Sequence, residues 1–130
     1  MSEVTDLIEQ AREAALTAYA PYSNFRVGAV AVGEDGSVHR SANVENASFG
    51  SGVCAESNAI TSAVASGVRK VRTVAVVCLD GEGCYPCGDC RQIMREFGVE
   101  RIIVEDGSGG VRIHSLDELL PHSFGPESLP

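Results

Sequence analysis

The stretch TVAVVCL, Thr73–Leu79, is a continuous apolar run rich in β-branched residues. Such a run is typical of a central strand that is covered on both faces of its sheet. It is far shorter than the roughly 20 apolar residues needed to cross a bilayer, so we expect no membrane span. Helical spacing of apolar residues begins near Cys54 before this strand and continues from Ile93 to Phe97 after it. A strand flanked by two helices indicates an α/β domain in layers.

The segments farther from this strand extend the same pattern. An N-terminal helix is predicted to end near Pro21, and FRVGAVAV and VHRSANV form a predicted hairpin around a turn at 34–37. After the third helix come the predicted strands RIIVE and VRIH and a last helix, in which Ser115 and Glu118 form a capping box. The tail PHSFGPESLP is expected to be poorly structured. We expect one domain over residues 1–130 with about five strands and four helices, an α/β fold whose sheet is covered by helices.

The composition limits the kinds of partner. Acidic residues number 18 against 10 basic ones, for a net charge of −8, so no extended positive surface is expected to bind a long nucleic acid. The N-terminus MSEVTDLIEQ lacks the basic and apolar segments of a secretory signal. The five cysteines are odd in number, which disfavours a disulfide framework and favours metal binding or catalysis. We therefore expect a soluble, cytoplasmic protein that uses some of its thiols chemically.

Three cysteines and a glutamate have the spacing of a metal site. Cys87-x-x-Cys90 places two thiols on one face at the start of a helix, where the helix N-terminus favours thiolates. Cys54 lies at the predicted start of the preceding helix, and we expect the two helix starts to face each other across an adjacent pair of parallel strands. Three thiolates with an open fourth position are typical of a catalytic Zn²⁺ site that retains water. Glu56 is then placed near the metal as a general acid and base.

The motifs CAE at 54–56 and PCGDC at 86–90 together resemble those of the zinc-dependent nucleobase deaminases. In that family a His or Cys and the two cysteines of Pro-Cys-x-x-Cys bind the metal, and a Glu two residues after the first ligand transfers the protons. The blocks YAPYSNFRVGA, NVENASFG, PCGDCRQ and LLPHSFGPESL are similar to successive blocks of the small cytidine deaminases. The resemblance implies a three-layer α/β/α fold with a mixed five-stranded sheet and one Zn²⁺ per subunit. It also implies hydrolytic deamination of cytidine or 2′-deoxycytidine in pyrimidine salvage, with Glu56 moving protons to N3 and to the departing amine.

The same resemblance implies which residues contact the nucleoside. Phe25 corresponds to the family position that lies against the base, and Ala55 to a position whose backbone N–H contacts the pyrimidine carbonyl. Asn43 and Glu45 correspond to the pair that binds the ribose 3′-hydroxyl, which suits an amide and a carboxylate because a hydroxyl both donates and accepts. Phe124 corresponds to an aromatic residue that reaches the site of a neighbouring subunit, so a homotetramer is implied.

The chain departs from the family pattern at two positions. Many members have Arg immediately after the catalytic Glu, where it offsets the charge of three thiolates, whereas this chain has Ser57. We expect the two helix N-termini, or Arg91, to supply that compensation. Phe49 stands where the family usually has Tyr, so any hydrogen bond of that hydroxyl is missing. Both departures leave open a deaminase of a modified cytosine nucleoside or of a nucleoside antibiotic.

Other interpretations of the cysteines also stay open. Cys84 as a fourth ligand would close the metal site and make the chain a zinc-stabilised binding module. The Cys-x-x-Cys-x-x-Cys spacing that begins at Cys84 is also seen in iron–sulfur ligation, but no Cys-Pro follows at the expected distance. Cys78 is expected to be a core residue in its strand. A deaminase that edits RNA or DNA shares the zinc motif, but the net charge of −8 opposes it.

Overall fold

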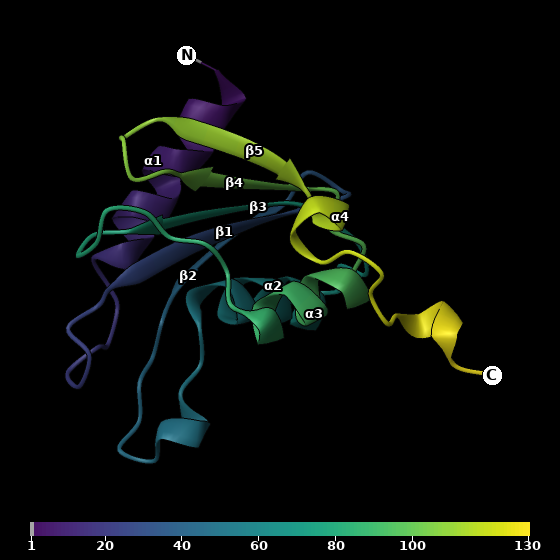
Figure 1. Ribbon diagram of the computed structural model, residues 1–130, viewed down its shortest axis with the longest axis horizontal. Helices are drawn as coiled ribbons and strands as arrows, with labels where there is room; N and C mark the ends of the chain where they lie inside the picture. The colour runs from purple at the N-terminus through teal and green to yellow at the C-terminus, as the bar shows by residue number, and fades with distance from the viewer. Residues whose placement is uncertain (1) are drawn as a thin grey trace.

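The structure is a computed structural model that describes residues 2–130, built around one five-stranded sheet with the strand order β2-β1-β3-β4-β5 (Figure 1). The strands are β1 (Val27–Gly33), β2 (Val38–Ala42), β3 (Val71–Cys78), β4 (Arg101–Glu105) and β5 (Val111–Ser115). The α-helices are α1 (Glu3–Ala15), α2 (Ala55–Ala65), α3 (Gly88–Glu96) and α4 (Leu116–Leu119). Strands β3 and β4 are parallel, and the other neighbouring strands are antiparallel. The mixed sheet expected for the chain is confirmed.

The sheet is the middle of three layers. Helix α1 packs on one face, and helices α2 and α3 pack on the other (Figure 1). The alternation of side chains along β3 puts Ala75 and Val77 on the α1 face, and Val74 and Val76 on the face of α2 and α3. All four are at most 1% exposed, and each valine contributes about 1.5–3 kcal/mol through burial. The predicted central strand is therefore confirmed, with both of its faces covered.

Helix α1 ends at Ala15 rather than near Pro21, where the spacing of apolar residues had placed its end. Beyond the helix the backbone N–H of Tyr19 donates to the carbonyl oxygen of Asn43 at 3.0 Å, and the carbonyl of Tyr19 accepts from the N–H of Glu45 at 2.8 Å. These long-range bonds take the place of helical ones, so the chain leaves the helix early. The pairing brings the segment after α1 alongside the segment after β2.

The close fit of α1 on the sheet depends on Gly28 in β1. A Cβ atom at this position would lie 2.0 Å from the carbonyl oxygen of Ala11 and 2.4 Å from the backbone nitrogen of Ala15. Both are backbone atoms of the helix, which cannot rotate away as a side chain can. Gly28 therefore sets how near α1 lies to β1.

The C-terminal part of the chain makes more contacts than expected. Ser115 and Glu118 form the predicted capping box at the start of α4. The tail, predicted to be poorly structured, is bonded to α3, because the side-chain amide of Gln92 donates to the carbonyl oxygen of Phe124 at 2.9 Å. In the described part of the chain, no helix is both long and apolar enough to cross a membrane.

Candidate active site

One edge of the sheet collects the residues that the motifs single out. Strands β2 and β3 end at this edge and β1 begins there, as the pairing of Gly28 with Ala42 and of Val27 with Cys78 shows. The prediction that α2 and α3 follow adjacent parallel strands is wrong, because β1 lies between β2 and β3. Both strands are antiparallel to β1, however, and so run in the same direction. The starts of α2 and α3 therefore still meet at one edge (Figure 1).

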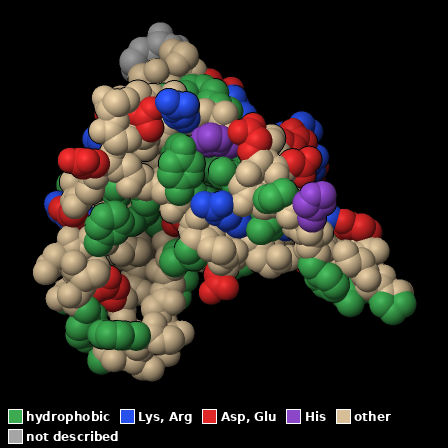
Figure 2. All heavy atoms as spheres, viewed as in Figure 1, with side chains coloured by type: hydrophobic (Ala, Val, Ile, Leu, Met, Phe, Trp, Pro, Cys, Tyr) green, Lys and Arg blue, Asp and Glu red, His purple; other side chains and the backbone are tan. Residues whose placement is uncertain are grey.

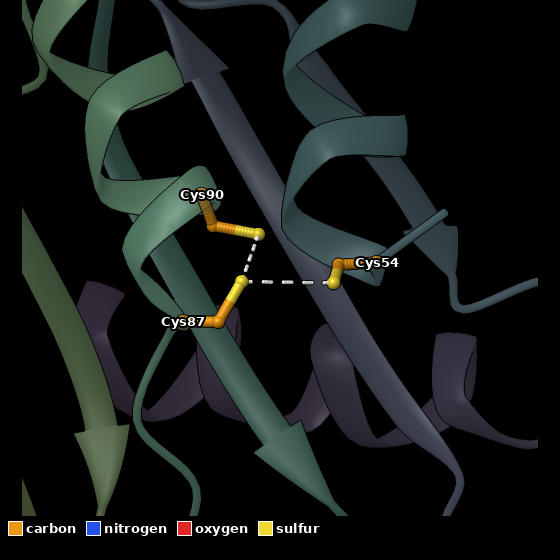
Figure 3. Close-up of side chains that lie close together, drawn as sticks. All are labelled: Cys54, Cys87 and Cys90. Carbon is orange, nitrogen blue, oxygen red and sulfur yellow. Dashed lines mark hydrogen bonds between the residues drawn. The ribbon is translucent and has the colours of Figure 1, made fainter. Parts of the chain in front are cut away.

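The three cysteines meet at the starts of these two helices (Figure 3). Cys54 is the N-cap residue of α2, Cys87 is the N-cap residue of α3, and Cys90 lies in the first turn of α3. The sulfur of Cys87 is 3.8 Å from that of Cys54 and 3.6 Å from that of Cys90, and all three sulfurs lie within 4.8 Å of one another. A tetrahedral Zn²⁺ with Zn–S bonds of about 2.3 Å spaces its sulfur ligands about 3.8 Å apart. The thiols therefore fit three corners of a zinc tetrahedron.

The three thiols differ in their surroundings. Cys54 and Cys87 are exposed and Cys90 is buried, so the cluster has an accessible side at the two exposed thiols. The pKa of Cys90 is raised, first by its hydrogen bond with Cys54 and then by burial. A bound cation must displace the proton of this thiol, which couples metal binding to pH. The N-termini of α2 and α3 favour the thiolate forms that a metal requires.

Glu56 is the buried carboxyl group beside the thiols. It is the second residue of α2, two positions after Cys54, and is 4% exposed. Burial raises the pKa of Glu56, while hydrogen bonds with its own backbone N–H and with Cys90 act in the opposite direction. A carboxyl group with a raised pKa can hold a proton nearer to neutral pH and release it again. These are the properties that a general acid and base requires.

The neighbours of the thiols show how their negative charge is offset. The hydroxyl of Ser57 lies 3.4 Å from the sulfur of Cys90, within reach for a hydrogen bond to the thiolate. Arg91, considered above as a compensating charge, donates instead to the carbonyl oxygens of Pro86 and Leu119, at 2.8 and 2.7 Å. It thereby ties the start of α3 to the end of α4. The sequence showed Ser57 only as a missing arginine, and no local pattern pointed to its contact with Cys90.

Cys84 lies outside the thiol cluster. Among residues 2–130, the group of side chains within metal-binding distance of one another holds three cysteines, and Cys84 is not one of them. Cys84 is half-buried against the core, and its pKa is raised to about 12, mainly by burial and then by the neighbouring Cys78 and Glu56. The arrangement favours an open site with three thiolates over a closed structural one.

Asn43 and Phe25 lie together where β1 begins. The side-chain oxygen of Asn43 accepts from the backbone N–H of Val27 at 2.9 Å, and its amide nitrogen donates to the carbonyl oxygen of Phe25 at 2.9 Å. A primary amide has two N–H donors and two lone pairs, so Asn43 keeps one donor and one lone pair for a ligand. Phe25 is 37% exposed, which leaves part of its ring accessible.

Glu45 stabilises the turn that leads to Phe25. One of its carboxylate oxygens accepts from the backbone N–H groups of Tyr22 and Ser23 at 3.0 and 3.1 Å, and the other accepts from the hydroxyl of Ser23. These bonds lower the pKa of Glu45, and the bond from the Ser23 hydroxyl lowers it most. A carboxylate accepts about four hydrogen bonds, so one position on Glu45 is left for a ligand.

Glu45 also lines a cavity of about 360 Å³, together with Phe49 and Tyr22. The rings of Phe49 and Tyr22 meet edge-on at a centroid distance of 5.8 Å.

The two remaining residues implied by the motifs lie in different environments. Ala55, the first residue of α2, is fully buried next to Cys54 and Glu56. Phe124 is 59% exposed in the C-terminal tail, which projects away from the sheet (Figure 1). The fold thus brings Ala55 and Glu56 to the thiols, whereas Phe124 lies on the surface of the domain.

Comparisons with known proteins assign this fold and site to a family. A family model described as the cytidine and deoxycytidylate deaminase zinc-binding region matches residues 1–106. The chain belongs to this family. The cytidine deaminase of Sporosarcina psychrophila is 38% identical over 98% of this chain and 95% of the relative. That of Halalkalibacterium halodurans is 41% identical over 95% of each chain.

Solved structures of the deaminase family have the same fold. The crystal structure of cytidine deaminase from Burkholderia pseudomallei is 44% identical and has a TM-score of 0.86, covering 95% of this chain and 100% of that one. The cytidine deaminase of Mycobacterium tuberculosis is 36% identical with a TM-score of 0.83, covering 96% of this chain and 99% of that one. The resemblance seen in the motifs is thereby confirmed, and the α/β deaminase fold with it. Since the family model describes a zinc-binding region, the three thiols are its candidate zinc site in this chain.

Proposed function

We propose that this chain is a zinc-dependent cytidine deaminase, which hydrolyses cytidine or 2′-deoxycytidine to the corresponding uridine and ammonia. The observation that carries the proposal is the group of three thiols at zinc spacing with the buried carboxyl group of Glu56 beside them. Relatives named cytidine deaminase match nearly the whole chain, which supports the same reaction here.

In this proposal Cys54, Cys87 and Cys90 hold the metal, and the N-termini of α2 and α3 stabilise their negative charge. When bound, Zn²⁺ supplies a Lewis acid that lowers the pKa of a water molecule. Glu56 accepts a proton from this water and delivers it to N3 of the pyrimidine as C4 is attacked. It then takes the remaining proton from the new hydroxyl on C4 and passes it to the amine, which leaves as ammonia while the C4 carbonyl forms. Its burial supports this role, because a carboxyl group with a raised pKa binds a proton more readily at neutral pH.

The nucleoside contacts in the proposal lie at the same sheet edge. Phe25 contacts the base, and the backbone N–H of Ala55 donates to the pyrimidine carbonyl. The free donor and lone pair of Asn43, with the free lone pair of Glu45, bind the ribose 3′-hydroxyl. The other hydrogen bonds of these two side chains go to residues 22–27. Ribose binding and the placement of Phe25 therefore depend on the same pair.

We propose further that the single domain, residues 1–130, assembles as a homotetramer in which Phe124 reaches the site of a neighbouring subunit. Phe124 is 59% exposed and Phe49 is 79% exposed. Hydrophobic atoms are exposed both on the projecting loop after β2 and on the C-terminal tail (Figure 2). Grouped apolar surface of this kind favours contact with another subunit. We also place the enzyme in the cytoplasm and in pyrimidine salvage, a role that suits a free nucleoside as substrate. The net charge of −8 opposes a long nucleic acid as the substrate instead.

The test follows the ultraviolet absorbance of cytidine and 2′-deoxycytidine incubated with purified protein. We expect conversion of either nucleoside by the wild type and none by Glu56→Ala, which still binds zinc because all three thiols are present. Glu96→Ala removes an exposed carboxylate at the end of α3 and serves as the control with unchanged activity. Turnover of bulkier cytosine nucleosides in place of cytidine would favour the modified-nucleoside alternative. Zinc-loaded protein that converts none of these nucleosides would contradict the proposal.

A further inference from the structure

The backbone around Phe25 is held from several directions. Its N–H donates to the hydroxyl of Ser23 at 3.0 Å, and its carbonyl oxygen accepts from Asn43 at 2.9 Å. The next residue, Arg26, donates its backbone N–H to the carboxylate of Asp80 at 2.8 Å and binds the same carboxylate through two guanidinium nitrogens at 3.0 Å. The ring of Phe25 is therefore the part of this residue that is free to move.

One edge of this ring lies against Gly81, in the loop between β3 and α3. A Cβ atom at position 81 would lie 2.8 Å from Cε1 and 3.3 Å from Cζ of Phe25, and 3.5 Å from the sulfur of Cys78. Gly81 is not among the glycines with positive φ, so its backbone conformation is open to other residues. The ring of Phe25 is therefore the group that a side chain at position 81 would displace.

We infer that Gly81 is a positioning residue for nucleoside binding that acts through Phe25. Without a side chain at position 81, the ring lies back against the loop between β3 and α3 and leaves its other side to the base. Part of the residue is accessible, since Phe25 is 37% exposed. The inference rests on the proposed function, in which Phe25 contacts the base. Gly81 thereby sets how much room the base has in front of the ring.

Gly81→Ala tests this role directly. The added methyl group pushes the ring away from position 81, because the backbone on both sides of Phe25 is held by hydrogen bonds. We expect KM for cytidine to rise about tenfold while kcat changes by less than about twofold, the pattern of lost substrate binding. The Kd of uridine, the product, should rise by the same factor. Zinc content should stay unchanged.

Gly107→Ala is the matched control. Gly107 lies in the loop after β4, next to the loop that carries Gly81, and the nearest atom to its added Cβ would be the carbonyl oxygen of Glu82 at an ordinary 3.4 Å. We expect KM and kcat of this variant to equal those of the wild type.

Phe25→Ala and the double variant complete a mutant cycle. If Gly81 acts through the ring, Gly81→Ala raises KM in the wild type and has little effect once the ring is absent. An equal effect in both backgrounds, or no effect in the wild type, would overturn the inference. An unchanged KM in Phe25→Ala alone would instead contradict the base contact of the proposed function. If Gly81→Ala does not fold, the double variant decides. Recovery of folding on addition of Phe25→Ala would support the contact between the ring and position 81, and no recovery would count against the inference.

Discussion

The hydroxyl oxygen of Ser57 lies 3.4 Å from the sulfur of Cys90, the buried member of the three thiols. Three thiolates give more negative charge than one Zn²⁺ ion neutralises, and a hydroxyl hydrogen bond withdraws part of that charge from the sulfur. The guanidinium of Arg91 is bonded to two carbonyl oxygens. Ser57 is therefore the side chain that hydrogen-bonds to Cys90, and the two helix N-termini add to the stabilisation of its charged form.

Removing this hydroxyl should weaken metal binding. We expect Ser57→Ala to bind zinc about tenfold more weakly, because partners that hydrogen-bond to metal ligands typically contribute 10–100-fold to affinity. Competition with a chelator measures the affinity. Ser57→Thr keeps the hydroxyl and should bind zinc as tightly as the wild type does. Ser62→Ala, which removes an exposed hydroxyl from the same helix, should also leave the zinc affinity unchanged. Equal affinity of Ser57→Ala and wild type would show that the helix N-termini suffice.

Cys84 should be dispensable for the metal. We expect Cys84→Ser to keep a full equivalent of zinc and its deaminase activity, because this sulfur lies outside the cluster. Cys87→Ser, which removes the thiol between the other two, should lose both. Metal analysis of the two purified variants makes the comparison. Loss of zinc from Cys84→Ser would revive the closed structural site.

Asn43 should affect stability as well as binding. Asn43→Ala removes hydrogen bonds to Val27 and Phe25, which together contribute about 2 kcal/mol to the free energy of unfolding. KM for cytidine should rise in the same variant, since Phe25 loses its backbone anchor. Urea denaturation and steady-state kinetics measure the two effects. A raised KM with unchanged stability would indicate that Asn43 acts only on the ribose.

Glu45 should make part of the stability depend on pH. Hydrogen bonds, first that from the Ser23 hydroxyl, lower its pKa from the usual value of 4.5. A carboxyl group with a lowered pKa in the folded state adds stability above its unfolded pKa, and this stability is lost as the pH falls through the folded value. We expect the midpoint of thermal unfolding to fall less steeply with pH in Glu45→Gln than in the wild type, from about pH 4.5 downward. Thermal melts recorded over a series of pH values measure the difference. Parallel curves would exclude a contribution from the carboxylate.

Local patterns in the sequence predicted the elements whose signals lie within a few residues. The capping box of Ser115 and Glu118 is confirmed, because it depends on groups inside one helical turn. The start of α2 after Cys54 is also confirmed, because the spacing of apolar residues from Ala59 to Val64 marks that helix. Cys87 and Cys90 were paired for the same reason, since residues three apart lie on one face of a helix. The continuous apolar run of β3 was sufficient to predict a strand covered on both sides.

Contacts between distant parts of the chain were decided by the tertiary structure alone. The order β2-β1-β3 brings the starts of α2 and α3 together even though their preceding strands are not neighbours. The early end of α1 follows from pairing of Tyr19 with the segment after β2. The contacts of Ser57 with Cys90 and of Gly81 with Phe25 likewise join separate elements. Periodicity describes which face of an element is buried, whereas the order of strands and the packing of helices decide which residues meet there.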